Sequence, residues 1–70
     1  MEGTEWLSKT LPEVKKEVMD QVERLYLEMA LTKTQGRVDQ TARIAGIHPR
    51  GLYNKMKRFG LHKESFKTLR

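Results

Sequence analysis

Residues 36–61 read GRVDQTARIAGIHPRGLYNKMKRFGL, and this stretch decides the fold because it encodes two short helices joined by a tight turn. The first helix is predicted over about Val38–Ala45 and the second over about Pro49–Phe59. Gly46 and Gly60 follow these helices, and glycine tolerates the left-handed conformation that ends a helix. A proline opens the second helix, where its missing N–H has no partner to lose. The pattern predicts a helix-turn-helix.

The apolar residues of this stretch occupy the positions that a helix-turn-helix needs. Ala42 is small where the two helices would cross closely, and Ile47 and Leu52 fill the space between them. Met56 and Phe59 continue the inner face of the second helix, because residues three and four apart share a face.

The opposite face of the second helix is polar and basic. At about 100° per residue, Arg50, Asn54, Lys57 and Arg58 turn away from the inner face, and Tyr53 flanks them. An α-helix fits the major groove of DNA, where arginine pairs with a guanine edge and asparagine with an adenine edge. This face therefore predicts a DNA-reading helix.

Roles follow from position along the helix. Arg50 and Asn54 are expected to read bases, with His48 near the helix start, while later cations are expected to hold phosphates. The alternatives to base contact are a phosphate contact for Arg50, a helix cap for His48, a solvated Asn54 and a Tyr53 ring packed on the preceding helix. The full candidate set is Arg37, Gln40, His48, Arg50, Tyr53, Asn54, Lys57 and Arg58.

A long helix is predicted before the helix-turn-helix, from about Leu11 to about Gln35. Thr10 and Glu13 match a capping box around Pro12, and Gly36 is expected to end the helix. One apolar stripe runs along it, wider than one small domain would cover, so the chain is expected to form a homodimer. The predicted dimerisation residues are Val14, Val18, Val22, Leu25 and Met29; Leu11, Met19, Tyr26 and Ala30 extend the stripe.

Composition excludes several classes of protein. The chain has 70 residues, no cysteine and two histidines, so neither a disulfide nor a metal site is expected. It has neither a membrane-length apolar run nor a signal-peptide pattern, and no paired carboxylates or activated nucleophile that would suggest an enzyme. Residues 1–36 hold five Lys/Arg against seven Asp/Glu, whereas residues 37–70 hold nine against two. This asymmetry favours an acidic scaffold half and a basic half that faces a polyanion.

Three segments are expected from these patterns. Residues 1–10 are interpreted as a linker or loose N-terminal turn, residues 11–61 as the DNA-binding domain, and residues 62–70 as a basic C-terminal tail. Leu61 and Phe66 are possible anchors for the tail. The fold class is therefore all-α, a long N-terminal helix followed by a helix-turn-helix.

The stretch from Gly36 to Leu61 resembles the Fis-type helix-turn-helix that closes the NtrC-class activators, the sigma-54-dependent bacterial enhancer-binding proteins. The preceding Glu23–Leu27, ERLYL, is similar to the long helix of that family. The residues that match its pattern are Gly36, Val38, Ala42, Gly46, Ile47, Leu52, Tyr53, Lys55, Lys57 and Gly60.

The resemblance implies a homodimer on an inverted-repeat enhancer site, without a cofactor, in the bacterial cytoplasm and associated with the nucleoid through DNA. It also implies a fragment of a larger activator whose ATPase and regulatory domains lie elsewhere. Three residues depart from the family pattern. Arg37 replaces an asparagine cap, so Asp39 is expected to cap the helix instead. Pro49 and Gly51 replace polar residues that contact DNA.

Two other functions fit the sequence. A Fis-like nucleoid protein that bends DNA would use the same fold with less sequence preference. A helical dimerisation or adaptor module, from a different class, would use the apolar stripe and leave the basic face incidental.

Overall fold

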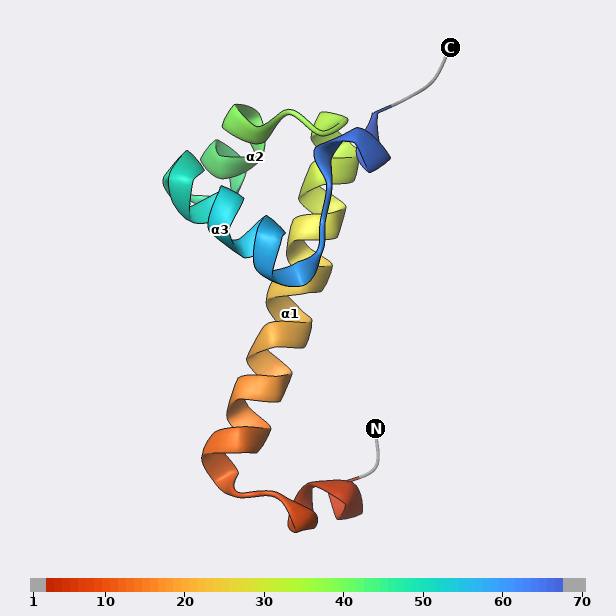
Figure 1. Ribbon diagram of the computed structural model, residues 1–70, viewed down its shortest axis with the longest axis vertical. Coiled ribbons are helices and arrows are strands. Elements are labelled where there is room, and N and C mark those ends of the chain that lie inside the picture. The colour runs from red at the N-terminus through yellow and green to blue at the C-terminus, as the bar shows by residue number, and fades with distance from the viewer. Residues whose placement is uncertain (1–2, 68–70) are drawn as a thin grey trace.

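The computed structural model describes residues 3–67 and contains three α-helices with a short 3₁₀ helix at each end (Figure 1). The elements are η1 (Gly3–Ser8), α1 (Leu11–Thr34), α2 (Val38–Ala45), α3 (Pro49–Phe59) and η2 (Lys63–Phe66). The all-helical fold with a long first helix is confirmed. The predicted N-terminal and C-terminal segments include residues 1–2 and 68–70, which lie outside the described residues.

Local hydrogen bonds set the ends of α1. The Thr10 hydroxyl accepts a bond from the Glu13 N–H, and the Glu13 carboxylate accepts one from the Thr10 N–H, at 2.8 Å. The Thr10 N–H and the Thr10 hydroxyl, which donates to the same carboxylate at 2.9 Å, hold the pKa of the Glu13 carboxyl below its usual range. At the other end Gln35, not Gly36, is the first left-handed residue, with φ of 57°. The Gly36 N–H then reaches back to the Leu31 carbonyl at 2.9 Å.

The turn between α2 and α3 is built around Gly46, whose φ is 71°. The next N–H, from Ile47, bonds to the Ala42 carbonyl at 3.0 Å and so satisfies the end of α2. Both helices begin and end at the residues predicted from sequence.

One hydrophobic core joins all three helices around the helix-turn-helix. Its buried members are Leu27, Leu31, Val38, Ala42, Leu52, Met56 and Leu61, with Ile47, Phe59 and Phe66 packed against them. The side chains of Leu31 and Leu52 are completely buried. The predicted inner face of α3 is therefore correct, and Leu61 and Phe66 do anchor the segment that follows α3.

Two buried hydroxyls fix the start of α2 against the end of α1. Thr34 and Thr41 are both buried, and their Oγ1 atoms lie 2.6 Å apart. The Thr41 hydroxyl also donates to the Arg37 carbonyl at 2.8 Å. Because buried hydroxyls need partners, this pair favours a single packing of α2 on α1.

The apolar stripe of α1 does not face this core. Leu27 and Leu31 point inward, and Leu25 and Met29 lie roughly on the other side of the helix with 60% and 71% of their surface exposed. The radius of gyration is 14.4 Å, against about 11 Å for a compact chain of this length. The N-terminal half of α1 therefore projects beyond the helix-turn-helix, as Figure 1 shows.

The segment predicted as a linker or loose N-terminal turn contains a short helix. Gly3–Ser8 forms the 3₁₀ helix η1, in which the Ser8 hydroxyl donates to the Glu5 carbonyl at 2.9 Å. The chain turns back at the start of α1, and Lys9 pairs with Glu17 there. This ion pair raises the pKa of Lys9.

Candidate nucleic-acid interface

The first turn of α3 is set by its cap. His48 is the N-cap residue, and its Nδ1 accepts a hydrogen bond from the Arg50 N–H at 3.1 Å. Pro49 occupies the first helical position and leaves no orphan donor there. The capping role that sequence alone left open for His48 is present in the structure.

Three polar side chains lie outward on α3, opposite its buried face. Arg50, Asn54 and Lys57 are all exposed, whereas Leu52 and Met56 are buried. A helix with its side chains is about 10–12 Å across, and the major groove of B-DNA is about 12 Å wide. This face is therefore free to enter a groove.

One flank of α3 is tied to α1 by ion pairs. The Lys55 Nζ lies 2.7 Å from the Glu23 carboxylate, and an Arg58 guanidinium nitrogen lies 2.5 Å from Asp20. The hydrogen bond from Lys16 and the charge of Arg58 together hold the pKa of Asp20 below its usual range. Arg58, a sequence candidate for phosphate binding, is thus turned toward α1 and not toward the centre of the outward face.

The other flank of α3 faces the start of α2. Arg37 and Gln40 are exposed there, and Tyr53 is half exposed beside them. Arg37 is the N-cap residue of α2, and its side chain makes no capping hydrogen bond. The expectation that Asp39 caps α2 is wrong, because Asp39 lies in the first turn of the helix and makes no such bond. The first N–H groups of α2 remain available to an anion.

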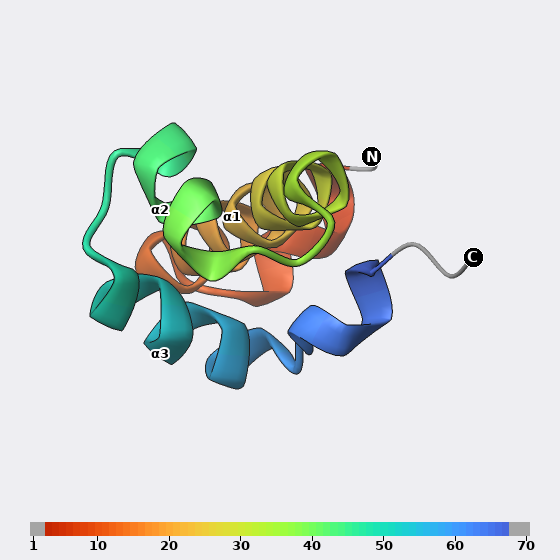
Figure 2. The same cartoon turned by 90° about the horizontal axis from the view of Figure 1, so that it is seen from above.

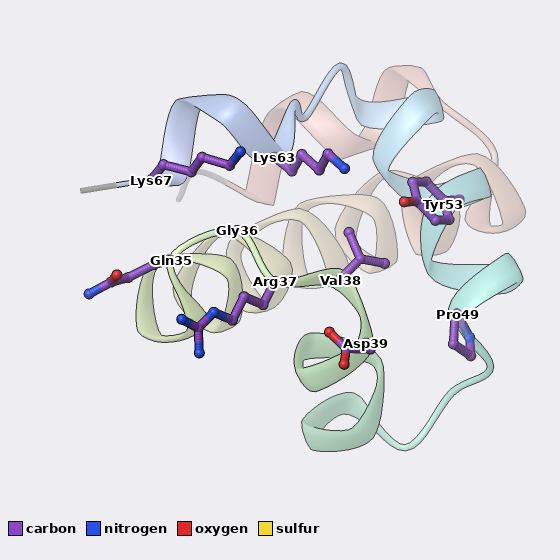
Figure 3. Close-up of a pocket in the computed structure, with 9 residues that line it drawn as sticks. All are labelled: Gln35, Gly36, Arg37, Val38, Asp39, Pro49, Tyr53, Lys63 and Lys67. Atoms are coloured by element: carbon purple, nitrogen blue, oxygen red, sulfur yellow. The ribbon is translucent and has the colours of Figure 1, made fainter. Parts of the chain in front are cut away.

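An open hollow of about 650 Å³ lies on this flank, between the start of α2, Tyr53 and the C-terminal segment (Figure 3). Lys63 and Lys67 lie on one side of it and Arg37 on the other. Sequence reasoning did not assign these two lysines to a site. The only signal was the basic composition of the tail, which does not show where the tail folds.

The residues predicted for dimerisation divide into two groups. Val14 is buried and Val18 half buried, near η1. Val22, Leu25 and Met29 are exposed and continue past Tyr26, whose hydroxyl donates to the Ile44 carbonyl at 3.3 Å. These exposed residues form an apolar surface next to the helix-turn-helix.

The described residues contain neither a metal-binding cluster nor a membrane-spanning helix. Within residues 3–67, no three histidine, cysteine or acidic side chains gather closely enough to hold a metal ion. None of the helices in that range is long and apolar enough to cross a membrane.

Comparison with known proteins gives one match. A family model described as "Bacterial regulatory protein, Fis family" matches residues 18–59, from the first half of α1 to the last residue of α3. Neither the curated proteins nor the solved structures include a significant match to the chain. The family match covers more than half of the chain and includes the whole helix-turn-helix, whereas η2 lies outside it.

Proposed function

The chain belongs to the Fis family of bacterial regulatory proteins, and we propose that it is the DNA-binding domain of a sigma-54-dependent transcription activator. The Fis-type helix-turn-helix is a DNA-binding domain that serves in transcription regulation and is not typically an enzyme. The assignment to the sigma-54-dependent activators rests on the resemblance of residues 36–61 to the terminal module of those proteins. Double-stranded DNA is the ligand in this proposal, and no cofactor takes part.

The outward face of α3 carries the proposal. Arg50, Asn54 and Lys57 are exposed together there, and α3 contains no acidic residue. In our proposal Arg50 and Asn54 contact base edges, because the first turns of such a helix usually meet the bases. Lys57 lies about two turns further along and holds a phosphate, and Arg37 and Gln40 hold the backbone near the start of α2. Tyr53, His48 and Arg58 border the same interface.

A two-fold dimer completes the proposed function. Val22, Leu25 and Met29 expose a continuous apolar surface, and such surfaces on small proteins commonly mark interfaces. A chain of this length also gains stability from a partner subunit. Val18, which is half buried, extends the surface toward η1 in this proposal, whereas Val14 is buried within the single chain and adds no exposed area to it.

The dimer predicts the form of the DNA site. Two copies of α3 related by a two-fold axis should enter successive major grooves about 34 Å apart. Selection of bound duplexes from random DNA should therefore yield an inverted repeat with half-site centres about 10–11 base pairs apart, or a multiple of that spacing. Full affinity for a single unpaired half-site would contradict this arrangement.

The base-reading role of Arg50 is tested by its replacement. Arg50→Ala should weaken binding by about 1–3 kcal/mol per contact and relax the preference at one base position of each half-site. Arg50→Lys is the matched control, because lysine keeps the charge but cannot form the two parallel bonds of a guanidinium. It should lose the same base preference while keeping more of the affinity.

Lys57→Ala provides the contrast. It should weaken selected and random DNA alike and reduce the salt dependence by about one unit per contact. The measurement is binding to a series of base-substituted sites at several salt concentrations. If Arg50→Ala also weakens every sequence equally, Arg50 holds a phosphate, and Asn54 and His48 become the candidates for base reading. A native chain that binds random and selected DNA equally would favour the nucleoid protein instead.

A further inference from the structure

The C-terminal segment that follows α3, Leu61–Lys67, folds back onto the end of α1. Leu61 is buried in the core and Phe66 packs against it. In Figure 2 this segment and α3 together form one edge of the molecule. The segment is therefore part of the folded domain, although it lies outside the residues that the family model matches.

Gly36 allows the C-terminal segment to pass close to the end of α1. Gly36 has φ of 83°, and a Cβ placed on it would collide with the Lys63 carbonyl oxygen and lie 3.3 Å from the carbonyl carbon. The backbone of Lys63 thus passes closer to Gly36 than any side chain at that position would permit. This approach fixes where the lysine at the start of η2 sits relative to the start of α2.

The result is a group of three cations around one hollow. Arg37, Lys63 and Lys67 line it, and Asp39 is the one acidic side chain among its lining residues. The ion pairs within residues 3–67 involve the cations Lys9, Lys16, Arg24, Lys55 and Arg58. The three cations of the hollow take part in none of them. Within residues 3–67, the cations on the α1 flank of α3 are therefore paired with carboxylates, and the three cations of the hollow are not.

This hollow is continuous with the outward face of α3. Tyr53 and Lys63 line both the hollow and a smaller neighbouring one, which Lys57 also lines. Glu64 contributes the single carboxylate of the smaller hollow. A cationic surface consequently runs from Lys57 through Lys63 to Lys67, while the first N–H groups of α2 lie at its far border.

We infer that Lys63 and Lys67, with Arg37, form a second phosphate-binding site, which holds the DNA backbone beside the groove that α3 enters. The inference rests on the proposed function and extends it, because it assigns a DNA contact to a segment outside the helix-turn-helix. The ligand is a run of phosphodiesters on duplex flanking the bases that α3 reads. Such contacts add affinity and salt dependence but carry no sequence preference.

The test is the salt dependence of binding by the full 70-residue chain. The double variant Lys63→Ala/Lys67→Ala is compared with the native chain on two duplexes, one that ends at the selected bases and one with a further helical turn on each side. On the longer duplex the double variant should reduce the slope of log K against log salt by about one unit for each lost contact in each subunit. Its base preference should not change. On the shorter duplex the native chain and the variant should bind equally.

Two control variants separate this site from general charge effects. Lys9→Ala removes one cation from the link between η1 and α1, a segment at the other end of the molecule from α2 (Figure 1), and should leave the slope unchanged. Lys63→Arg/Lys67→Arg keeps both charges and should restore the native slope. A native slope in the alanine variant on the longer duplex, or an equal loss on both duplexes, would overturn the inference while leaving the role of α3 intact. A native chain that binds neither duplex would overturn the proposed function as well.

Discussion

The double variant Val22→Glu/Leu25→Glu should be a folded monomer that binds its inverted repeat about 10²–10⁴-fold more weakly than the native chain. Both side chains are more than half exposed in the single chain, so carboxylates there leave its core untouched. Across a two-fold axis the same substitutions would bury four carboxylates against each other, which is strongly unfavourable. Loss of the dimer removes the effective concentration that delivers the second α3 to its half-site.

Sedimentation tests the oligomeric state, circular dichroism tests whether the variant is folded, and DNA titration tests the loss of affinity. The matched control is Val22→Ile/Leu25→Met, which keeps both positions apolar and should remain dimeric. Helix content should be similar in the variant and the control. A native chain that sediments as a well-folded monomer at high concentration would contradict the proposed dimer and leave the exposed surface of α1 to another partner.

Leu31→Ala should destabilise the fold by about 2–5 kcal/mol, which is much of the total stability of a chain this short. Leu31 loses all its exposure in the core that joins α1, α2 and α3, so truncation leaves a cavity there. The matched control is Leu7→Ala, because Leu7 in η1 is 84% exposed and its truncation should change stability by less than about 0.5 kcal/mol. Urea denaturation of both variants measures the difference. Equal effects would show that α1 does not pack inward through the face that contains Leu31.

Only part of the candidate site could be predicted from the sequence. The outward position of Arg50, Asn54 and Lys57 could be predicted, because they share a short helix with an unmistakable apolar face. The orientation of Arg58 could not, because Asp20, its partner, is 38 residues away. The position of Lys63 and Lys67 could not either, since it depends on the return of the chain past Gly36.

The sequence by itself determined where α2 and α3 begin and end and where α1 begins. Capping and chain reversal depend on residues within a few positions of each other, such as Thr10 with Glu13, Gly46 after α2 and His48 before α3. These local interactions are the same wherever the helix lies in the molecule, which is why the predicted bounds of α2 and α3 agree with the structure.

Only the tertiary structure decided which face of α1 is the core. Periodicity predicted one apolar stripe, which contains Leu25 and Met29, whereas the structure packs a second apolar face with Leu27 and Leu31 into the core. Which face packs within the chain depends on where α2 comes to rest, and that is fixed by the buried Thr34–Thr41 pair and by the fit of α3 against Leu31. Because these contacts join different helices, no pattern within α1 alone distinguishes its inner face from the face that stays exposed.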